Sequence, residues 1–336
     1  MTEDMSWFQQ LTGIEESTPD QVRTELSVDG DCLVCPDARR IAFGRLETPT
    51  LAELRSKAEA TKPSSGRLTI CERVADVRQL HADPRNAGAL FQVASQFNLL
   101  EMASPSVTPE RGVGIYEHDH TQGPACAVAC GAGTIYRNYF ASVGDRIGQS
   151  HDHQIDCSAD LGTQLGNVEG RLWKLQNGYL FPSDSGLKTI GQKLRAADPE
   201  TVDRYRASLR IGLQWDTAVT LAGAEHRVSQ AYCSALPVAY GRQPAAEWTD
   251  FAKLVLDAAY EATLAAATIN WAKTGSNKLY LTLLGGGVFG NRNAWILDAI
   301  QRAALLYRES PLEVAIVSYG TSKPEVARLV RQFNET

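Results

Sequence analysis

The sequence LTLLGGGVFGNRNAW, residues 281–295, contains the clearest structural signal in the chain. It runs from an apolar segment, expected to be a strand, through three consecutive glycines into the start of a predicted helix. Glycines let backbone N–H groups close on an anion because no side chain blocks the approach, and the N-terminus of the following helix attracts negative charge. The stretch therefore predicts a strand, a phosphate-binding turn and a helix.

The same letters also satisfy Gly285-x-Gly287-x-x-Gly290, the dinucleotide fingerprint. That fingerprint opens the first strand–helix unit of a Rossmann fold, and an acidic residue for the ribose hydroxyls follows about 20 residues later. Here the glycines lie near the C-terminus, and the next expected strand ends in AIVSYG, with no acid at its tip. An NAD(P)-dependent Rossmann enzyme is therefore the less favoured alternative, and a merely structural tight turn is another.

The composition indicates a globular protein with a sizeable core. The 336 residues are 43% hydrophobic and 21% charged, which suits one large domain or two modest ones. The net charge of -6 argues against bulk attraction to nucleic acid or to an anionic membrane. The start MTEDMSWFQQ lacks the features of a signal peptide, and no apolar run reaches the roughly 20 residues that span a bilayer. We expect a cytoplasmic monomer.

Metal or redox chemistry is not predicted from the seven cysteines and six histidines. The pair Cys32-x-x-Cys35 has no second CxxC and is followed directly by proline. The two cysteines of GPACAVACGAG fit a small-residue helix, where a buried thiol acts as a small hydrophobe. The two histidines of GQSHDHQID lie in a polar loop. We therefore expect reduced thiols, no metal site and no cofactor.

The order of expected elements favours an α/β sheet covered on both faces. Residues 1–63 form an extension or cap that ends in the connector-like KAEATKPSSGR, and residues 64–336 form the main domain. RLTICERVADV and the apolar start of AGALFQVASQFNLLEM read as strands, and IGLQWDTAVTL with RVSQAYCSALPVAY reads as a hairpin. The expected helices are one beginning near Pro124, two broken at DP within residues 184–210, residues 247–272 and residues 293–308. LEVAIVS is expected as the last strand.

A strand, then GxGVFG, a helix and one final strand resemble the diphosphate-binding loop of macrodomains, the ADP-ribose-binding α/β/α fold. The likeness is strongest at GGGVFGN and TQGPA. The first macrodomain loop is replaced here by YEHDHTQGPA and there is no Asn-Ala-Ala-Asn, so the chain is most similar to the MavL-like branch, divergent relatives of poly(ADP-ribose) glycohydrolases. The resemblance implies a macrodomain-like three-layer α/β/α fold with a mixed central sheet and an N-terminal extension.

The resemblance also implies ligand contacts. ADP-ribose, or a protein that carries it, such as ubiquitin, is the implied partner. Asp76 would receive the adenine amino group and Asn98 would face the distal ribose, while Tyr319 would either stack on adenine or only pack. The glycine turn would hold the diphosphate, and the TQG turn would hold the proximal phosphate or the distal ribose. Asn291 or Asn293 can cap the helix behind the glycines. The residues of the two turns are Gly285, Gly286, Gly287, Val288, Phe289, Gly290, Thr121, Gln122 and Gly123.

Four acids lie in or next to one loop: Glu101, Glu110, Glu117 and Asp119. Cleavage at the ribose C1 passes through an oxocarbenium-like transition state, which uses one carboxyl group on the leaving group and another on water. Asp119, before the TQGP turn, and Glu101, at the end of an expected apolar strand, are the favoured pair. Glu110 and Glu117 could equally be solvated charges of the loop. The predicted activity is hydrolysis of ADP-ribose from protein side chains, an N- or O-glycosidic bond. The alternative is a non-catalytic module that binds ADP-ribose.

Overall fold

The computed structural model describes residues 5–61 and 66–335. A seven-stranded mixed sheet forms its centre, in the order β4-β11-β12-β6-β13-β14-β5. The strands from β12 to β5 run parallel, and β4 and β11 continue the sheet antiparallel at one edge. The strand bounds are β4 (Arg45–Glu47), β5 (Thr69–Val74), β6 (Leu90–Ala94), β11 (Gly212–Ala218), β12 (Arg227–Cys233), β13 (Lys278–Leu281) and β14 (Glu313–Ser318).

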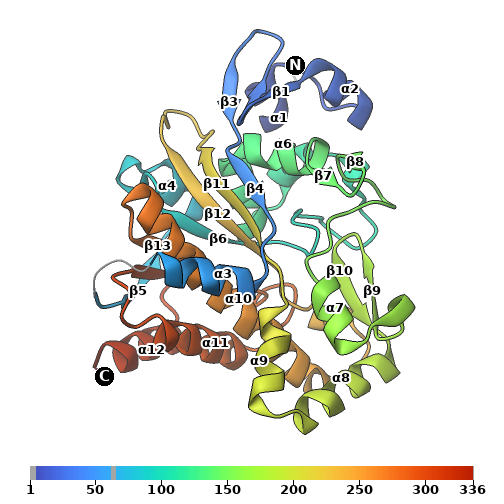
Figure 1. Cartoon of the computed structure of the whole chain (residues 1–336). Coiled ribbons are helices and arrows are strands. Elements are labelled where there is room, and N and C mark those ends of the chain that lie inside the picture. The colour runs from blue at the N-terminus through green and yellow to red at the C-terminus, as the bar shows by residue number, and fades with distance from the viewer. Residues whose placement is uncertain (1–4, 62–65, 336) are drawn as a thin grey trace.

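Helices cover both faces of this sheet (Figure 1). One layer contains α4 (Val77–Ala82), α5 (Gln122–Ala129) and α6 (Gly131–Tyr139). The other contains α3 (Leu51–Ala60), α10 (Ala245–Thr274), α11 (Asn293–Leu306) and α12 (Pro324–Glu335). The middle of α10 is buried on all sides because it packs on the sheet, on α3 and on α11 at once. The predicted three-layer α/β/α fold with a mixed sheet is thus confirmed.

Most of the strongly patterned segments form the expected elements. The hairpin is β11 with β12, and the helical stretch broken at DP is α8 (Asp184–Ala196) followed by α9 (Pro199–Ala207). LEVAIVS forms β14, the last strand, as predicted, and the amphipathic helix α12, which was not predicted, follows it and packs against α11 and β5.

The apolar run before Glu101 does not stay in the sheet. β6 ends at Ala94, and the chain then turns, with Leu99 in the left-handed region at φ 65°. The Asn98 side chain accepts the N–H of Leu100 at 3.1 Å, which supplies the local hydrogen bond of that turn. Glu101 therefore lies in a buried loop, and its prediction as the end of a strand was wrong.

The N-terminal part of the chain contacts the main sheet directly. Its β4 pairs with β11, and Arg55 of α3 donates to Asp203 of α9 and to Glu261 of α10. The predicted boundary at residues 63 and 64 lies outside the described residues. The elements that precede β4 are α1 (Trp7–Thr12), α2 (Pro19–Glu25), β1 (Ser27–Asp29), β2 (Cys32–Val34) and β3 (Arg40–Ala42).

The remaining elements lie between α6 and α8 or in short 3-10 turns. They are β7 (Ser142–Val143), β8 (Arg146–Ile147), α7 (Ala159–Leu165), β9 (Trp173–Gln176), β10 (Tyr179–Pro182), η1 (Pro84–Asn86), η2 (Pro109–Arg111), η3 (Gly114–His118), η4 (Val168–Gly170) and η5 (Val238–Tyr240). Among the described helices, none combines the length and the apolar character needed to cross a membrane.

Candidate active site

A cavity of about 570 Å³ lies at the carboxyl ends of the parallel strands of the central sheet. Residues that follow β5, β6, β12, β13 and β14 all line it, because parallel strands present their carboxyl ends on the same side of a sheet. The volume suits a ligand larger than a single sugar or base. The predicted site residues that line the cavity are Asp76, Glu101, Asp119, Thr121, Gln122, Gly123, Gly285, Gly286, Gly287, Val288, Phe289 and Tyr319.

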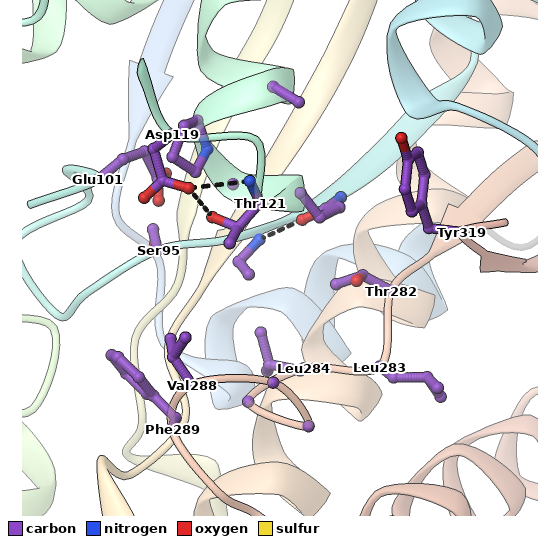
Figure 2. A pocket seen from close by; sticks show the side chains of 18 of the residues that line it. Ser95, Glu101, Asp119, Thr121, Thr282, Leu283, Leu284, Val288, Phe289 and Tyr319 are labelled. Carbon is purple, nitrogen blue, oxygen red and sulfur yellow. Dashed lines mark hydrogen bonds between the residues drawn. The ribbon is translucent and has the colours of Figure 1, made fainter. Parts of the chain in front are cut away.

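The glycine turn lies along one wall of this cavity (Figure 2). Gly285 has φ 71°, and a Cβ there would meet the Cβ of Ala235 at 2.5 Å, so only glycine fits. A Cβ on Gly287, in contrast, would have no neighbour within 4 Å and would enter open space. The N–H groups of Gly287, Val288 and Phe289 have no acceptor in the described part of the chain. They are therefore available to an anion.

Two details of this turn differ from the sequence predictions. The N–H of Gly290 donates to the carbonyl of Gly287 at 3.0 Å, so it is not free for a phosphate, and Gly290 does not line the cavity. Asn291 does not cap α11, whose N-cap is Arg292 without a side-chain hydrogen bond. The buried Asn291 side chain instead donates to the carbonyl of Leu236 at 2.8 Å, which ties the glycine turn to the segment after β12.

Glu101 and Asp119 meet at one end of the cavity (Figure 2). Glu101 is only 4% exposed, and its Oε1 has no hydrogen-bond partner among the described residues. Burial raises the pKa of Glu101 well above its usual value, and although the nearby guanidinium of Arg137 lowers it, the charge of Asp119 raises it further. Burial therefore favours the protonated form of Glu101.

The TQG turn shapes this end of the cavity. Asp119 accepts hydrogen bonds from the N–H and the hydroxyl of Thr121, at 2.8 and 2.7 Å, which orient its carboxylate. The Gln122 side chain is engaged with β6, because it accepts the N–H of Ala94 at 3.0 Å and donates to the backbone there. A Cβ on Gly123 would lie 2.1 Å from the Ala94 carbonyl, so glycine is required where α5 meets the strand.

Asp76 and Tyr319, which follow the neighbouring strands β5 and β14, also line the cavity. Tyr319 follows β14 and is 78% exposed, so it is not a packing residue, and its ring stands at the cavity edge (Figure 2). One oxygen of Asp76 caps α4 by accepting the N–H of Arg78 at 2.8 Å. Arg78 and Lys323 line the same region and have no carboxylate within 4 Å in the described ranges.

Besides Gly290 and Asn291, three further predicted residues lie outside the cavity. Asn98 is fully buried and donates to Gln154. Glu110 accepts the N–H and a ring nitrogen of His151 at 2.8 and 3.1 Å; burial raises its pKa, but these hydrogen bonds prevail and lower it. Glu117 accepts the N–H of Trp7 at 3.0 Å. Each of these side chains already serves a structural contact.

Several lining residues had no signal in the sequence. Tyr179 and Tyr240 contact each other and Phe289 with ring centroids 5.3 to 5.8 Å apart, although the three come from β10, η5 and the glycine turn. Ser95 and Gln96 directly follow β6, and their place at a strand's carboxyl end is the one hint that was available. Within residues 5–61 and 66–335, no three His, Cys, Asp or Glu side chains gather so that they could hold a metal ion.

Comparison with known proteins gives likeness only at the level of solved structures. No family model matches the chain, and no curated protein matches it. It is similar to a poly(ADP-ribose) glycohydrolase from Thermomonospora curvata bound to the inhibitor ADP-HPD, at 16% identity over 95% of this chain and 96% of that one, with a TM-score of 0.42. It is also similar to the enzyme from Deinococcus radiodurans in complex with ADP-ribose, at 13% identity over 87% and 94%, with a TM-score of 0.48. Similarity at this level does not assign an activity.

Proposed function

We propose that this chain hydrolyses the bond between ADP-ribose and a protein side chain at C1 of the distal ribose. The observation that carries the proposal is the carboxyl group of Glu101, buried and unpartnered at Oε1, beside the carboxylate of Asp119 in an open cavity. A buried acid without a partner destabilises the fold, so its position next to a second acid favours a chemical role.

The glycine turn would bind the diphosphate. The free N–H groups of Gly287, Val288 and Phe289 point to an anion, and the 14-residue helix α11 begins shortly after them. Because Tyr319 and the acids lie at different ends of the same cavity, a ligand held at its diphosphate could place adenosine near Tyr319 and the distal ribose near Glu101. These contacts match the two halves of ADP-ribose.

The two carboxyl groups would divide the chemistry between them. Glu101, whose protonated form is favoured by burial, would donate its proton to the departing side-chain atom as the C1 bond breaks. Asp119, oriented by Thr121, would accept a proton from the water that attacks C1. The products are free ADP-ribose and the unmodified side chain, and the two proton transfers balance.

The test compares the parent protein with Glu101→Gln and Asp119→Asn. We expect the parent to release ADP-ribose from an ADP-ribosylated protein, and each variant to lose about 10²- to 10⁴-fold in rate because one proton transfer is removed. Both variants should still bind ADP-ribose, measured as a rise in melting temperature with millimolar ligand. Asp145→Asn, an exposed acid in the turn between β7 and β8, is the matched control and should keep the parental rate.

Two other results would lead to different conclusions. If ADP-ribose failed to stabilise the parent, the cavity would not be an ADP-ribose site and the proposal would fall. If parent and variants all bound ADP-ribose but none released it from protein, the chain would be a module that binds ADP-ribose without cleaving it.

A further inference from the structure

The N-terminal segment places a carboxylate against the loop that leads to Asp119. Glu16 lies between α1 and α2. Its Oε1 accepts the N–H of Val113 at 2.9 Å and the hydroxyl of Tyr139 at 2.7 Å, and its Oε2 accepts the N–H of Gly114 at 2.6 Å. Three donors from two distant segments therefore converge on one side chain.

The loop is shaped to receive this carboxylate. A Cβ on Gly112 would lie 2.6 Å from the carboxyl carbon of Glu16, and a Cβ on Gly114 would lie 2.6 Å from its Oε2. Gly112 also has φ 86°, which glycine adopts without strain. Any side chain at either position would displace Glu16, so these glycines and Glu16 form one fitted contact.

Trp7 of α1 adds a second contact to the same loop. Its backbone N–H donates to Glu117 at 3.0 Å, and its indole N–H donates to the carbonyl of Val113 at 3.3 Å. The loop from Gly112 to Glu117 is thus held at both of its ends by the N-terminal segment.

The held loop in turn positions both acids of the cavity. Tyr116, which is buried in η3, accepts the N–H of Glu101 on its hydroxyl at 2.9 Å. Its carbonyl accepts the N–H of Asp119 at 3.2 Å. A shift of Tyr116 would therefore move the backbones of Glu101 and Asp119 together.

We propose that Glu16 is a positioning residue: it fixes the loop through Val113 and Gly114, and the loop fixes Glu101 and Asp119 through Tyr116. Glu16 does not line the cavity and does not touch the ligand. This role rests on the proposed hydrolase function, and it gives the N-terminal segment a part in the reaction.

The test uses Glu16→Gln, which keeps the size of the side chain but replaces one acceptor oxygen by an NH₂ group. We expect the rate constant for ADP-ribose release to fall about 10- to 100-fold, because small misplacements of reacting groups are costly. The KM and the affinity for ADP-ribose should stay within about twofold, since the glycine turn is untouched. Glu15→Gln, at the exposed neighbouring position, should behave as the parent.

Hydrogen exchange of residues 112–119 gives a readout that does not depend on turnover. Exchange should become faster in Glu16→Gln and not in Glu15→Gln, while α10 keeps its protection. Unchanged exchange, or faster exchange with an unchanged rate constant, would overturn the proposed role.

An inactive parent would remove the hydrolase function, and with it the catalytic role of Glu16, while the exchange result would still decide whether Glu16 holds the loop. If Glu16→Gln did not fold, Tyr139→Phe would replace it, because that change removes a single donor to Glu16. Parental kinetics together with parental exchange in Tyr139→Phe would then overturn the proposal.

Discussion

At the scale of single residues, Glu101 is where burial and chemistry conflict. Glu101 is almost completely buried. The guanidinium of Arg137 is also fully buried nearby, but it donates to the carbonyl of Leu99 and to Thr134 and not to the Glu101 carboxyl group. Without a direct ion pair, the charged form of Glu101 is poorly solvated and the neutral form is favoured. The same property that suits an acid catalyst therefore weakens the folded state.

This conflict predicts a pH-dependent effect of Glu101→Gln on stability. Well below the usual carboxyl pKa of 4.5, Glu101 is protonated in both the folded and the unfolded chain. As the pH rises above that value, the unfolded chain loses the proton and the folded chain keeps it, so the free energy of unfolding falls until the raised folded-state pKa is reached. Glutamine does not titrate, so the Glu101→Gln variant does not lose this stability. The melting temperature of Glu101→Gln should therefore exceed the parental value by a margin that grows with pH above the usual carboxyl pKa.

Thermal melts over a pH series measure this margin. Glu59→Gln, an exposed glutamate on α3, serves as the control and should follow the parental curve. A difference between Glu101→Gln and the parent that stays constant with pH would show that Glu101 does not hold its proton in the folded protein.

At the scale of elements, the turn between β13 and α11 contains glycines with different tasks. Gly285 and Gly290 have positive φ and close neighbours, so they are needed for the course of the backbone. Gly287, which lies between them in the same turn, has neither a positive φ nor a close neighbour. The structural and the binding roles of the turn can therefore be separated by substitution.

We predict that Gly287→Ala and Gly285→Ala fail in different ways. The methyl group of Gly287→Ala enters the cavity, so folding stability should stay within about 0.5 kcal/mol of the parent. Alanine keeps the backbone N–H, but the added methyl group should obstruct the approach of the phosphate; losing one N–H contact in this way costs about 1.5–3 kcal/mol and weakens ADP-ribose binding tenfold or more. Gly285→Ala should lower the free energy of unfolding by more than about 1 kcal/mol, since its φ is positive. Calorimetry measures the affinity for ADP-ribose, and denaturant unfolding measures the free energy of unfolding. Unaltered ADP-ribose affinity in Gly287→Ala would contradict diphosphate binding at this turn.

At the scale of the whole molecule, a net charge of -6 opposes the close approach of a second copy and of a phosphate backbone. The monomeric state, the lack of nucleic-acid binding and the cytoplasmic location stay predictions. Arg78 and Lys323, which have no carboxylate within 4 Å among the described residues, lie in the cavity wall, and we predict that they act on a bound ligand and not on a long polyanion.

Light scattering and fluorescence anisotropy test the two predictions that follow from charge. The mass in solution should match 36.6 kDa, and a labelled oligoadenylate should not bind at physiological salt. Oligoadenylate is a suitable probe because it shares adenosine and phosphate with ADP-ribose. A dimer mass, or binding that weakens steeply with added salt, would contradict this account of the molecular charge.

The sequence alone determined the features that depend on neighbours in the chain. The buried helix α10, the hairpin of β11 and β12, and the strand–glycine–helix unit were all predicted, because periodicity, turn residues and glycine runs act over short distances. The same local logic predicted an anion site at the glycine turn and favoured Glu101 and Asp119 among four acids, while the resemblance to macrodomains added the TQG turn. The roles of these residues stay predictions.

Only the tertiary structure decided which of these residues meet. It brought Glu101 and Asp119 into one cavity, turned Glu110 and Glu117 into structural contacts, and added Tyr179 from a distant hairpin. The strand order and the contact of Glu16 with Val113 and Gly114 likewise join segments far apart in the chain. Such contacts depend on how complementary surfaces pack and on which buried polar groups find partners, and no local pattern along the chain records either.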